Sequence, residues 1–210
     1  MKIGFLGILF FTVLLLCSCS EDDSVMPSYR QDLAELTTDA SGRGQQLLLD
    51  NGTVFQIENN VSGLVPDTLY RIFALYTMSG NSQVIVEGAR SVLSPFPLDR
   101  REVNLKTAPV ELKALWKSAR YINFLVGVKT GGGEQTFGFV NHGIVKVSEG
   151  ISKLSLELFH DQKTDPLYYT QDTYLSCPIY QYADTLKAGA DSVEMKVSTT
   201  DGVKIKSFVY

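Results

Sequence analysis

The stretch VEMKVSTTDGVKIK, residues 193–206, decides the fold class of this chain. Before a Thr-Asp-Gly turn at residues 200–202 every second residue is apolar, and after the turn valine and isoleucine alternate with lysine. Because successive side chains of a β-strand point to opposite faces, this pattern is typical of a hairpin with one buried and one solvated face. The end of the chain is therefore predicted to be an antiparallel pair of strands.

The same signs of strands and tight turns recur toward the N-terminus. Residues 45–49 and 53–57 flank an Asn-Gly pair, which favours the turn of a two-residue β-hairpin. Further strands are predicted at residues 70–78, 83–87, 120–129, 135–141, 153–160 and 174–182. Residues 110–116 indicate either an edge strand or a short helical turn, and residues 183–189 a short helical connection. The predicted fold class is all-β.

A proline-containing break divides these strands into two groups. Residues 94–97 read Ser-Pro-Phe-Pro, and two prolines flanking one residue cannot continue a central strand. A charged run follows at residues 99–102, so we place a domain boundary near residue 100. The short strands of residues 31–99 predict an OB-like small barrel, and those of residues 104–210 predict a β-sandwich.

The first residues have the pattern of a lipoprotein signal peptide. Lys2 precedes an uncharged apolar run over residues 3–16, which is short for a membrane-spanning helix. The following Leu-Cys-Ser-Cys resembles the lipobox of bacterial lipoproteins, so cleavage is expected after residue 18 and lipidation at Cys19. The alternatives are a plain secretory signal and a membrane anchor. The lipid itself is the predicted contact with the membrane.

An acidic tether follows the lipidated cysteine, over residues 19–30. Its first residues after Cys19 are Ser20, Glu21, Asp22 and Asp23. This cluster resembles the surface-export signal of gut-anaerobe lipoproteins, which implies an outer-membrane protein that faces the cell exterior. The alternative is an ordinary solvated linker.

Charge and cysteine content exclude several classes of protein. The formal net charge is −4, whereas nucleic-acid binding requires clustered Lys and Arg, so no nucleic-acid partner is expected. Of the three cysteines, Cys17 is removed with the signal peptide and Cys19 is lipidated. Cys177 is then alone, so no intramolecular disulfide can form and the fold must depend on its hydrophobic core. We expect Cys177 to be a buried, unreactive thiol.

Catalytic and metal-binding patterns are not apparent in the sequence. The two histidines are His142 and His160, whereas a catalytic triad or a zinc site needs several convergent donors. A cation site at His160 and Asp161 is the less favoured interpretation of a histidine at a strand end. The glycines of residues 131–133 are not followed by Lys-Ser/Thr or a helix, so they predict a hairpin loop and not a phosphate-binding loop. No catalytic residue, metal or cofactor is predicted.

Two aromatic features could contribute to binding. Trp116 is the only tryptophan, and we favour a place in the core over a role as a ligand platform. Tyrosines are concentrated in residues 168–182, where their preference for strands is the simplest explanation. Tyr168 and Tyr169 follow an Asp-Pro turn, and adjacent residues on an extended chain cannot both face the core. We therefore predict that Tyr168 and Tyr169 contribute to a ligand or partner surface.

At this point the residues show a resemblance to the NigD-like lipoproteins. Residues 32–39 leading into LLLDNGT at 47–53 resemble the N-terminal half of that family. Leu-Trp at 115–116, YINF at 121–124 and LELFH at 156–160 are similar to its C-terminal half. The resemblance covers nearly all of the chain after the signal peptide. It implies an OB-like barrel followed by a β-sandwich, and it brings no enzymatic activity and no binding residue.

The favoured function is that of a non-catalytic, surface-exposed binding or accessory module for a glycan or a protein partner. Its location, its two β-domains and the lack of a catalytic set favour this prediction. The second hypothesis is an envelope structural or assembly lipoprotein with a protein partner only. The third is a hydrolase that uses carboxylates such as Glu157 and Asp161, which would have to face each other across a cleft.

Overall fold

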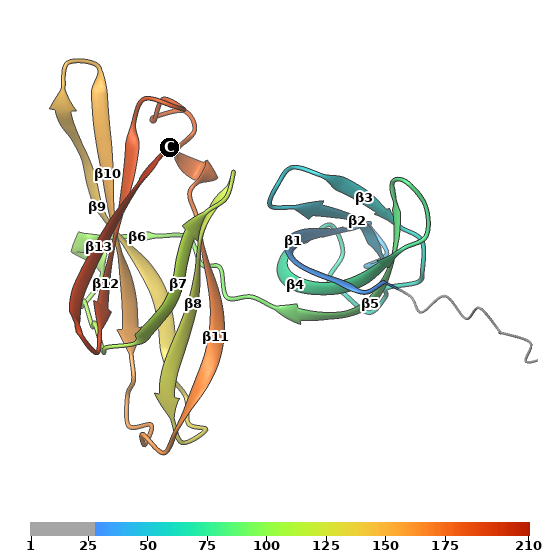
Figure 1. Cartoon of the computed structure of the whole chain (residues 1–210), viewed down its shortest axis with the longest axis horizontal. Coiled ribbons are helices and arrows are strands. Elements are labelled where there is room, and N and C mark those ends of the chain that lie inside the picture. Colours follow the sequence, from blue (N-terminus) through green and yellow to red (C-terminus); the bar gives the residue numbers. More distant parts are fainter. Residues whose placement is uncertain (1–27) are drawn as a thin grey trace, which may run out of the picture.

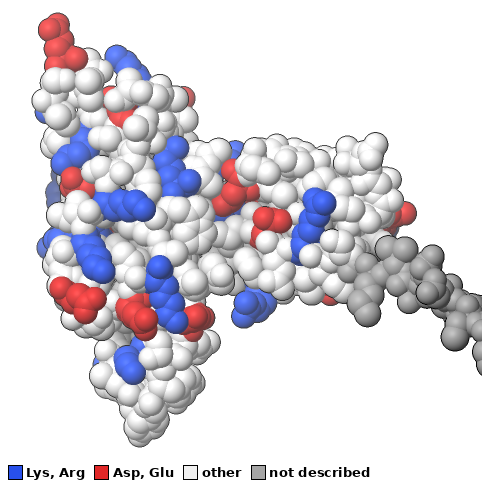
Figure 2. Space-filling view, in the orientation of Figure 1, with Lys and Arg blue, Asp and Glu red and all other residues white. Residues whose placement is uncertain are grey.

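The structure, a computed structural model, describes residues 28–210, which form a β-barrel and a β-sandwich packed side by side (Figure 1). In the same orientation, Figure 2 shows acidic and basic side chains interspersed over both units. Short 3-10 turns, η1 (Arg100–Glu102) and η2 (Tyr180–Tyr182), lie between strands. The predicted all-β fold, with an N-terminal OB-like barrel before a sandwich, is confirmed. No helix in the described range is long and apolar enough to cross a membrane.

The barrel is a closed sheet with the strand order β1-β2-β3-β5-β4. Its strands are β1 (Arg30–Thr38), β2 (Gly44–Leu49), β3 (Val54–Ile57), β4 (Leu69–Met78) and β5 (Gln83–Ser91). The predicted Asn-Gly turn joins β2 to β3. Gly52 has a φ of 88°, which favours glycine, and the Asn51 side chain accepts a hydrogen bond from the Thr53 amide at 2.9 Å. The barrel core contains Ala34, Leu36, Leu47, Phe55, Ile72, Tyr76 and Val84.

The sandwich consists of a five-stranded sheet, β13-β12-β10-β9-β6, and a three-stranded sheet, β11-β8-β7. Their bounds are β6 (Leu98–Asp99), β7 (Glu111–Lys117), β8 (Tyr121–Thr130), β9 (Thr136–Ser148), β10 (Ile151–Asp161), β11 (Tyr169–Pro178), β12 (Ser192–Thr199) and β13 (Gly202–Val209). The apolar residues of facing strands form one continuous core, which includes Ile122, Phe124, Val126, Leu154, Leu156, Val193 and Met195.

The C-terminal hairpin forms as predicted, but its second arm faces the other way. Val193, Met195 and Val197 of β12 are fully buried. In the β12–β13 register Val197 is opposite Lys204, so the lysines of β13 lie on the core-facing side. Ile205 is therefore on the outer face, where 59% of it is exposed. The prediction of a buried apolar face on this arm is wrong, because alternation fixes the period of a strand and the turn fixes which face is buried.

Other local predictions are resolved by the strand pairing. Residues 110–116 contribute to an edge strand, β7, and do not form a helical turn. Strand β11 ends at Pro178, and the 3-10 turn η2 follows, whereas residues 183–189 form turns without a helix. The barrel strands end at Ser91, and Leu98–Asp99 already pairs with β9.

Candidate functional site

The candidate site lies where the outer face of the barrel meets the outer face of the three-stranded sandwich sheet (Figure 1). In β8 the even-numbered residues 122–128 face the sandwich core, so Tyr121 and Asn123 face the barrel. On the barrel side, Glu35 and Arg71 are cross-strand partners on β1 and β4. Strand alternation on each unit thus brings polar side chains to the junction.

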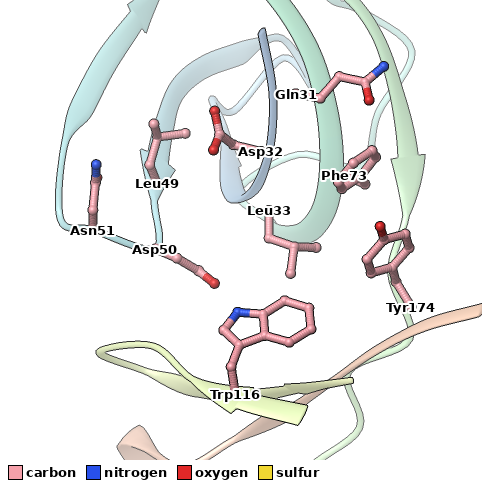
Figure 3. Close-up of a pocket in the computed structure, with 9 residues that line it drawn as sticks. All are labelled: Gln31, Asp32, Leu33, Leu49, Asp50, Asn51, Phe73, Trp116 and Tyr174. Atoms are coloured by element: carbon pink, nitrogen blue, oxygen red, sulfur yellow. The ribbon is translucent and has the colours of Figure 1, made fainter. Parts of the chain in front are cut away.

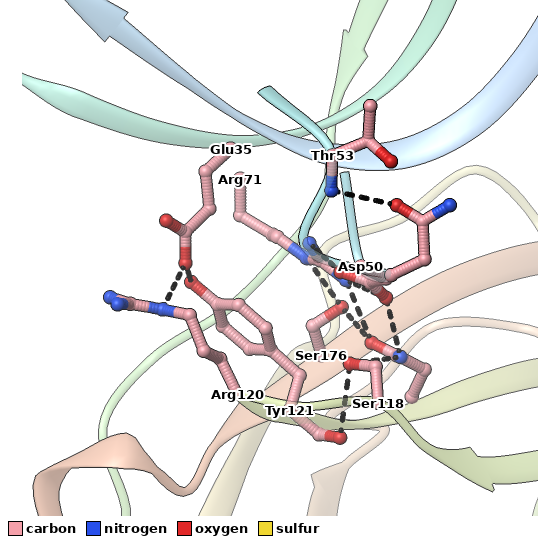
Figure 4. A network of polar contacts seen from close by, with 10 residues as sticks. Glu35, Asp50, Thr53, Arg71, Ser118, Arg120, Tyr121 and Ser176 are labelled. Atoms are coloured by element: carbon pink, nitrogen blue, oxygen red, sulfur yellow. Dashed lines mark hydrogen bonds and ion pairs between the residues drawn. The ribbon is translucent and has the colours of Figure 1, made fainter. Parts of the chain in front are cut away.

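Arg71 is the centre of the contact between the two units (Figure 4). Its guanidinium is bidentate on Asp50, with N–O distances of 2.6 and 2.8 Å. It also donates to Asn123 Oδ1 at 3.0 Å and to Ser176 Oγ at 3.1 Å, and it lies 4.0 Å from the centroid of the Tyr121 ring. Only 3% of the Arg71 side chain is exposed. A buried guanidinium needs such a complete set of partners, and this set spans both units.

Glu35 forms a second buried contact across the junction. The Tyr121 hydroxyl donates to Glu35 Oε1 at 2.6 Å, and Arg120 Nε lies 2.8 Å from the same oxygen as an ion pair with poor hydrogen-bond alignment. Burial, and then the hydrogen bond to Glu35, raise the pKa of Tyr121. The guanidinium of Arg120 also lies 4.2 Å from the Tyr180 ring centroid. Together with Arg71, these contacts fix the barrel against the sandwich.

An aromatic contact continues the junction beyond the polar contacts. Phe73 of β4 stacks on Tyr174 of β11, with 4.9 Å between ring centroids and 15° between ring planes. Next to this stack, Leu93 of the connecting segment forms a parallel bridge with Leu175.

A cleft of about 320 Å³ opens next to this stack, between the two units (Figure 3). Phe73, Trp116 and Tyr174 supply its aromatic walls. Its non-aromatic polar side chains come from the barrel and are those of Gln31, Asp32, Asp50 and Asn51. Trp116 extends from β7 toward Leu33 and Asp50, so both units are needed to build the cleft.

The two carboxylates of the cleft differ in how they are bonded. Both oxygens of Asp50 accept hydrogen bonds from Arg71, and one also accepts from Asn123 at 2.9 Å. Asp32 accepts through Oδ2 from the Tyr76 hydroxyl at 2.8 Å, and this is its single side-chain bond among the described residues. Burial, and then this bond, raise the pKa of Tyr76 to about 12. Asp32 therefore offers a free oxygen to the cleft, and Asp50 is occupied.

Trp116 is not where the sequence predicted. It is half-buried, lines the cleft and belongs to neither core cluster, so the favoured place in the core is wrong. The reason is the phase of β7, in which Leu115 faces the sandwich core and its neighbour faces the barrel.

Tyr168 and Tyr169 lie away from this cleft. They are 80% and 50% exposed, in the loop before β11 and at its first residue. Tyr169 pairs with Thr130, at the opposite end of β11 from Ser176 in the junction. Their exposure allows a contact with a partner, and their role in binding remains a prediction. Cys19 and residues 20–23 of the tether lie outside the described residues.

The contacts of the two histidines and of Cys177 are those of structural residues. His160 bonds Ala108 O at 2.9 Å and Gln135 Oε1 at 2.6 Å and stacks on Phe137, and burial lowers its pKa. His142 bonds the buried Glu157 at 2.8 Å. Cys177 is fully buried, which raises its pKa. Among residues 28–210, no three or more His, Cys, Asp or Glu side chains are grouped to hold a metal ion.

Sequence reasoning missed Arg71 and the cleft. The available signal was the single arginine in the strand YRIFALYTM, residues 70–78, because a charge within an apolar strand needs a buried partner. That partner, Asp50, lies in the predicted hairpin turn, and nothing in the sequence indicated that this turn faces a second domain.

The chain is similar in fold to several solved structures, all below 25% identity. A NigD-like immunity protein from Bacteroides caccae is 24% identical, with a TM-score of 0.65 over 87% of this chain and 98% of that one. A candidate toxin-related protein from Parabacteroides distasonis is 14% identical, with a TM-score of 0.69 over 87% and 93% of the two chains. A candidate lipoprotein from Bacteroides fragilis is 10% identical, with a TM-score of 0.60 over 87% and 98%.

None of the curated proteins matches this chain at a significant level. The family described as the NigD-like C-terminal beta sandwich domain matches residues 95–210. This range begins in the segment between the two units and includes the whole sandwich. Since the match covers more than half of the sequence, the chain belongs to the NigD-like family.

Proposed function

We propose that this NigD-like protein is a lipid-anchored, non-catalytic binding module of the outer membrane, and that it holds a glycan in the cleft between barrel and sandwich. The observation that carries this proposal is the combination of accessible aromatic rings and uncommitted polar groups in one concave site. Ligand sites in proteins commonly combine concave apolar walls with a few placed polar groups.

The side chains of the cleft suit a sugar ring. Phe73, Trp116 and Tyr174 offer flat apolar surfaces on which the CH-bearing face of a sugar can stack. Gln31 can donate and accept hydrogen bonds, and the free oxygen of Asp32 can accept them from sugar hydroxyls. A preformed cleft of this kind binds without a large loss of conformational entropy.

Binding without catalysis is favoured by the state of the carboxylates. A glycosidase of the common kind needs one carboxyl to hold a proton and a second to act as base or nucleophile. Asp50 is engaged on both oxygens by Arg71, so it does not supply a free acid beside Asp32. Glu157 is bonded to His142 and Lys196, and Asp161 is bonded to Lys106, none of which lines the cleft.

The anchor and the outward-facing location rest on the N-terminal sequence. The apolar run, the lipobox ending at Cys19 and the acidic residues 20–23 support export and lipidation. The similar fold of a candidate lipoprotein from Bacteroides fragilis is in keeping with this assignment.

Trp116 allows the ligand site to be tested directly. It is the only tryptophan in the chain, so its fluorescence reports on the cleft alone. We expect a binding glycan to displace water from the indole and to shift its emission to shorter wavelength. Trp116→Ala should weaken binding measured by calorimetry by about 1–2 kcal/mol. Tyr182→Phe serves as a control, because Tyr182 packs on the sandwich core and does not line the cleft. A glycan panel that leaves Trp116 emission unchanged and gives no heat would contradict the proposal.

A protein partner is the second candidate, and an exposed loop favours it. Leu167, Tyr168 and Tyr169 are each at least half exposed, next to the loop of residues 131–133. The NigD-like immunity protein from Bacteroides caccae has a fold similar to that of this chain. In this case the double variant Tyr168→Ala, Tyr169→Ala should lose binding to an envelope protein, and Trp116→Ala should keep it. An unchanged affinity in the double variant would reject the assignment of this loop.

The location is tested separately. Cys19→Ala should release the protein from the membrane fraction or stop its processing. Replacing Glu21, Asp22 and Asp23 with Ala should remove surface accessibility to protease while the lipid is kept. A Cys19→Ala protein that stays membrane-bound with normal mobility would contradict the lipoprotein assignment.

A further inference from the structure

The last strand, β13, has one free edge (Figure 1). It is an outer strand of the five-stranded sheet, and among the described residues it pairs with β12 alone. The Tyr210 amide donates to Asp191 O at 2.8 Å, and the register continues from there without a shift, so the even-numbered positions of β13 are the ones hydrogen-bonded to β12. The backbone N–H and C=O groups of the odd-numbered residues therefore point to the free edge. These residues are Val203, Ile205, Ser207 and Val209.

The side chains of these residues are mostly apolar and accessible. Val203, Ile205 and Val209 are each more than half exposed on the outer face of the sheet. A row of unpaired backbone groups beside exposed β-branched side chains is the surface to which a partner chain adds a strand. The edge of β13 thus has the backbone and the side chains that strand addition requires.

A cavity of about 440 Å³ lies on the inner side of this edge. It opens between β13 and β7, the outer strands of the two sandwich sheets. Its lining residues are Leu112, Lys113, Ala114, Leu115, Lys204, Ile205 and Lys206, so it contains three lysines and no acidic residue. Every second side chain of a strand added to β13 would point to this inner side.

The lysines of this cavity carry more charge than the fold neutralises. Lys113 is paired with Asp172, and Lys206 Nζ donates to the Leu115 carbonyl at 2.8 Å without a carboxylate partner. Lys204 takes part in no ion pair among residues 28–210. The inner side of the edge is therefore positively charged and attracts acidic side chains.

We infer that the free edge of β13 accepts an extended acidic segment of a partner protein as an added strand. Directly opposite residues of paired strands share a face, so the segment has Asp or Glu opposite Lys204 and Lys206. Opposite Val203 and Ile205 it has apolar residues. This surface shares no lining residue with the cleft between barrel and sandwich, so it is an interaction beyond the proposed glycan binding.

The charge on this edge disfavours a second copy of the chain as the added strand. If two β13 strands paired with each other, Lys204 and Lys206 of both copies would gather on the same inner side. Like charges on facing strands are destabilising, whereas an acidic segment removes the repulsion. Charge complementarity therefore selects a different chain as the occupant.

The test uses the mature protein and a labelled peptide as long as β13 in which valine and glutamate alternate. We expect this peptide to bind, measured by fluorescence anisotropy, and to slow hydrogen exchange at the free amides of Val203, Ile205 and Ser207. Three control peptides should bind weakly or not at all. One has lysine in place of glutamate, one has the same composition in two blocks, and one is N-methylated on the amides that would face β13.

A charge reversal on the protein tests the selection of an acidic segment. Lys204→Glu should weaken binding of the valine–glutamate peptide about 3- to 30-fold, because an attractive cross-strand pair becomes a repulsive one. Lys204 is exposed, so the urea midpoint should stay close to that of wild type. Lys146→Glu on the exposed part of β9 is the matched control, and Trp116→Ala tests independence from the cleft. Both should bind the peptide as wild type does.

The other outcomes would overturn the inference. Equal binding of the block or N-methylated peptide, or binding without protection of the three amides, would show a charge contact without strand addition. Equal binding of the lysine peptide would reject the acidic class. A dimer in sedimentation that depends on β13 would make a second copy the occupant. If no peptide binds, the inference is wrong, and the glycan proposal is still judged separately by Trp116 emission.

Discussion

A bonded carboxylate lies near each end of strand β11, and the two carboxylates are neutralised by different chemistry. At the junction, Asp50 is neutralised by the charged guanidinium of Arg71, with Ser176 of β11 hydrogen-bonded to that guanidinium. At the other end, Asp165 accepts from neutral donors only, which are the Thr130 hydroxyl, the Gln135 amide and the backbone N–H groups of Gly131 and Gly133.

The difference reflects what each carboxylate holds together. Asp165 orders a loop within one unit, where backbone dipoles are available at short range. Asp50 holds Arg71 of its own unit, the barrel, and the long Arg71 side chain then reaches across the junction to Asn123 and Ser176. A charge that reaches across becomes costly when its partner is removed, so the two ends should respond differently to mutation.

The largest effect is expected for Arg71→Met. The change removes the buried guanidinium that bonds both oxygens of Asp50, whose side chain is only 21% exposed, and this should cost about 3–5 kcal/mol of unfolding free energy. Calorimetry should also show two transitions in place of one, because the units lose their main polar contact. Adding Asp50→Asn to Arg71→Met should recover part of the loss. If Arg71→Met alone melts like wild type, the junction does not depend on the Arg71–Asp50 pair.

A smaller and more local effect is expected for Asp165→Asn. The amide group brings two N–H donors to a site that already contains only donors, so the loop of residues 131–133 should lose order. Hydrogen exchange should increase at Gly131 and Gly133 and remain unchanged at Asn123 in the junction. Equal exchange at both ends would remove the distinction between them.

The end of β11 that Asp165 holds should also respond to acid. Hydrogen bonds from Gln135, and then from Thr130, lower the pKa of Asp165 to about 2. An unfolded aspartate titrates near ~3.9, so the stabilisation from this group is complete above about pH 4 and is lost as the pH falls toward 2. The difference in urea midpoint between wild type and Asp165→Asn should therefore shrink over this interval. A difference that is constant between pH 2 and pH 6 would contradict the assignment.

The middle of β11 offers an intermediate test. Phe73 and Tyr174 stack across the junction, and such a pair is worth about 0.5–1.5 kcal/mol beyond the area it buries. A double-mutant cycle with Phe73→Leu and Tyr174→Leu, measured by urea unfolding, should give a coupling energy in that range. A coupling near zero would mean that the rings are neighbours without mutual stabilisation.

The smallest effect is expected where a charge pair lies at the surface. Lys163 is 2.5 Å from Glu134, but the glutamate side chain is 82% exposed. Lys163→Ala should change the unfolding free energy by less than about 0.5 kcal/mol, because water and salt screen such a pair. A loss as large as that of Arg71→Met would show that burial is not what separates the two ends.

Local chemistry was predictable from the sequence, and contacts between units were not. The Asn51-Gly52 turn follows from two adjacent residues, and the overall order of barrel and sandwich follows from strand patterns and proline. Trp116 was misplaced because its exposure depends on the phase of an edge strand and on a cleft made by a separate unit.

Val203 and Ile205 were misplaced for a related reason. The alternation of the last strand was correct, but an edge strand covers only part of the core, so its apolar residues need not point inward. Arg71 was the clearest indication in the sequence of a buried polar contact. Its burial could be suspected from the strand around it, whereas its partners come from three segments that only the folded structure brings together.

The inward-facing lysines of β13 have a consequence for molecules crowded on a surface. Strands β7 and β13 are the outer strands of their sheets, and Lys206 Nζ donates to the Leu115 carbonyl of β7 at 2.8 Å. That carbonyl is one that a strand from a second molecule would need in order to extend the sheet. By occupying it with an ammonium group, the protein protects an open edge against edge-to-edge aggregation.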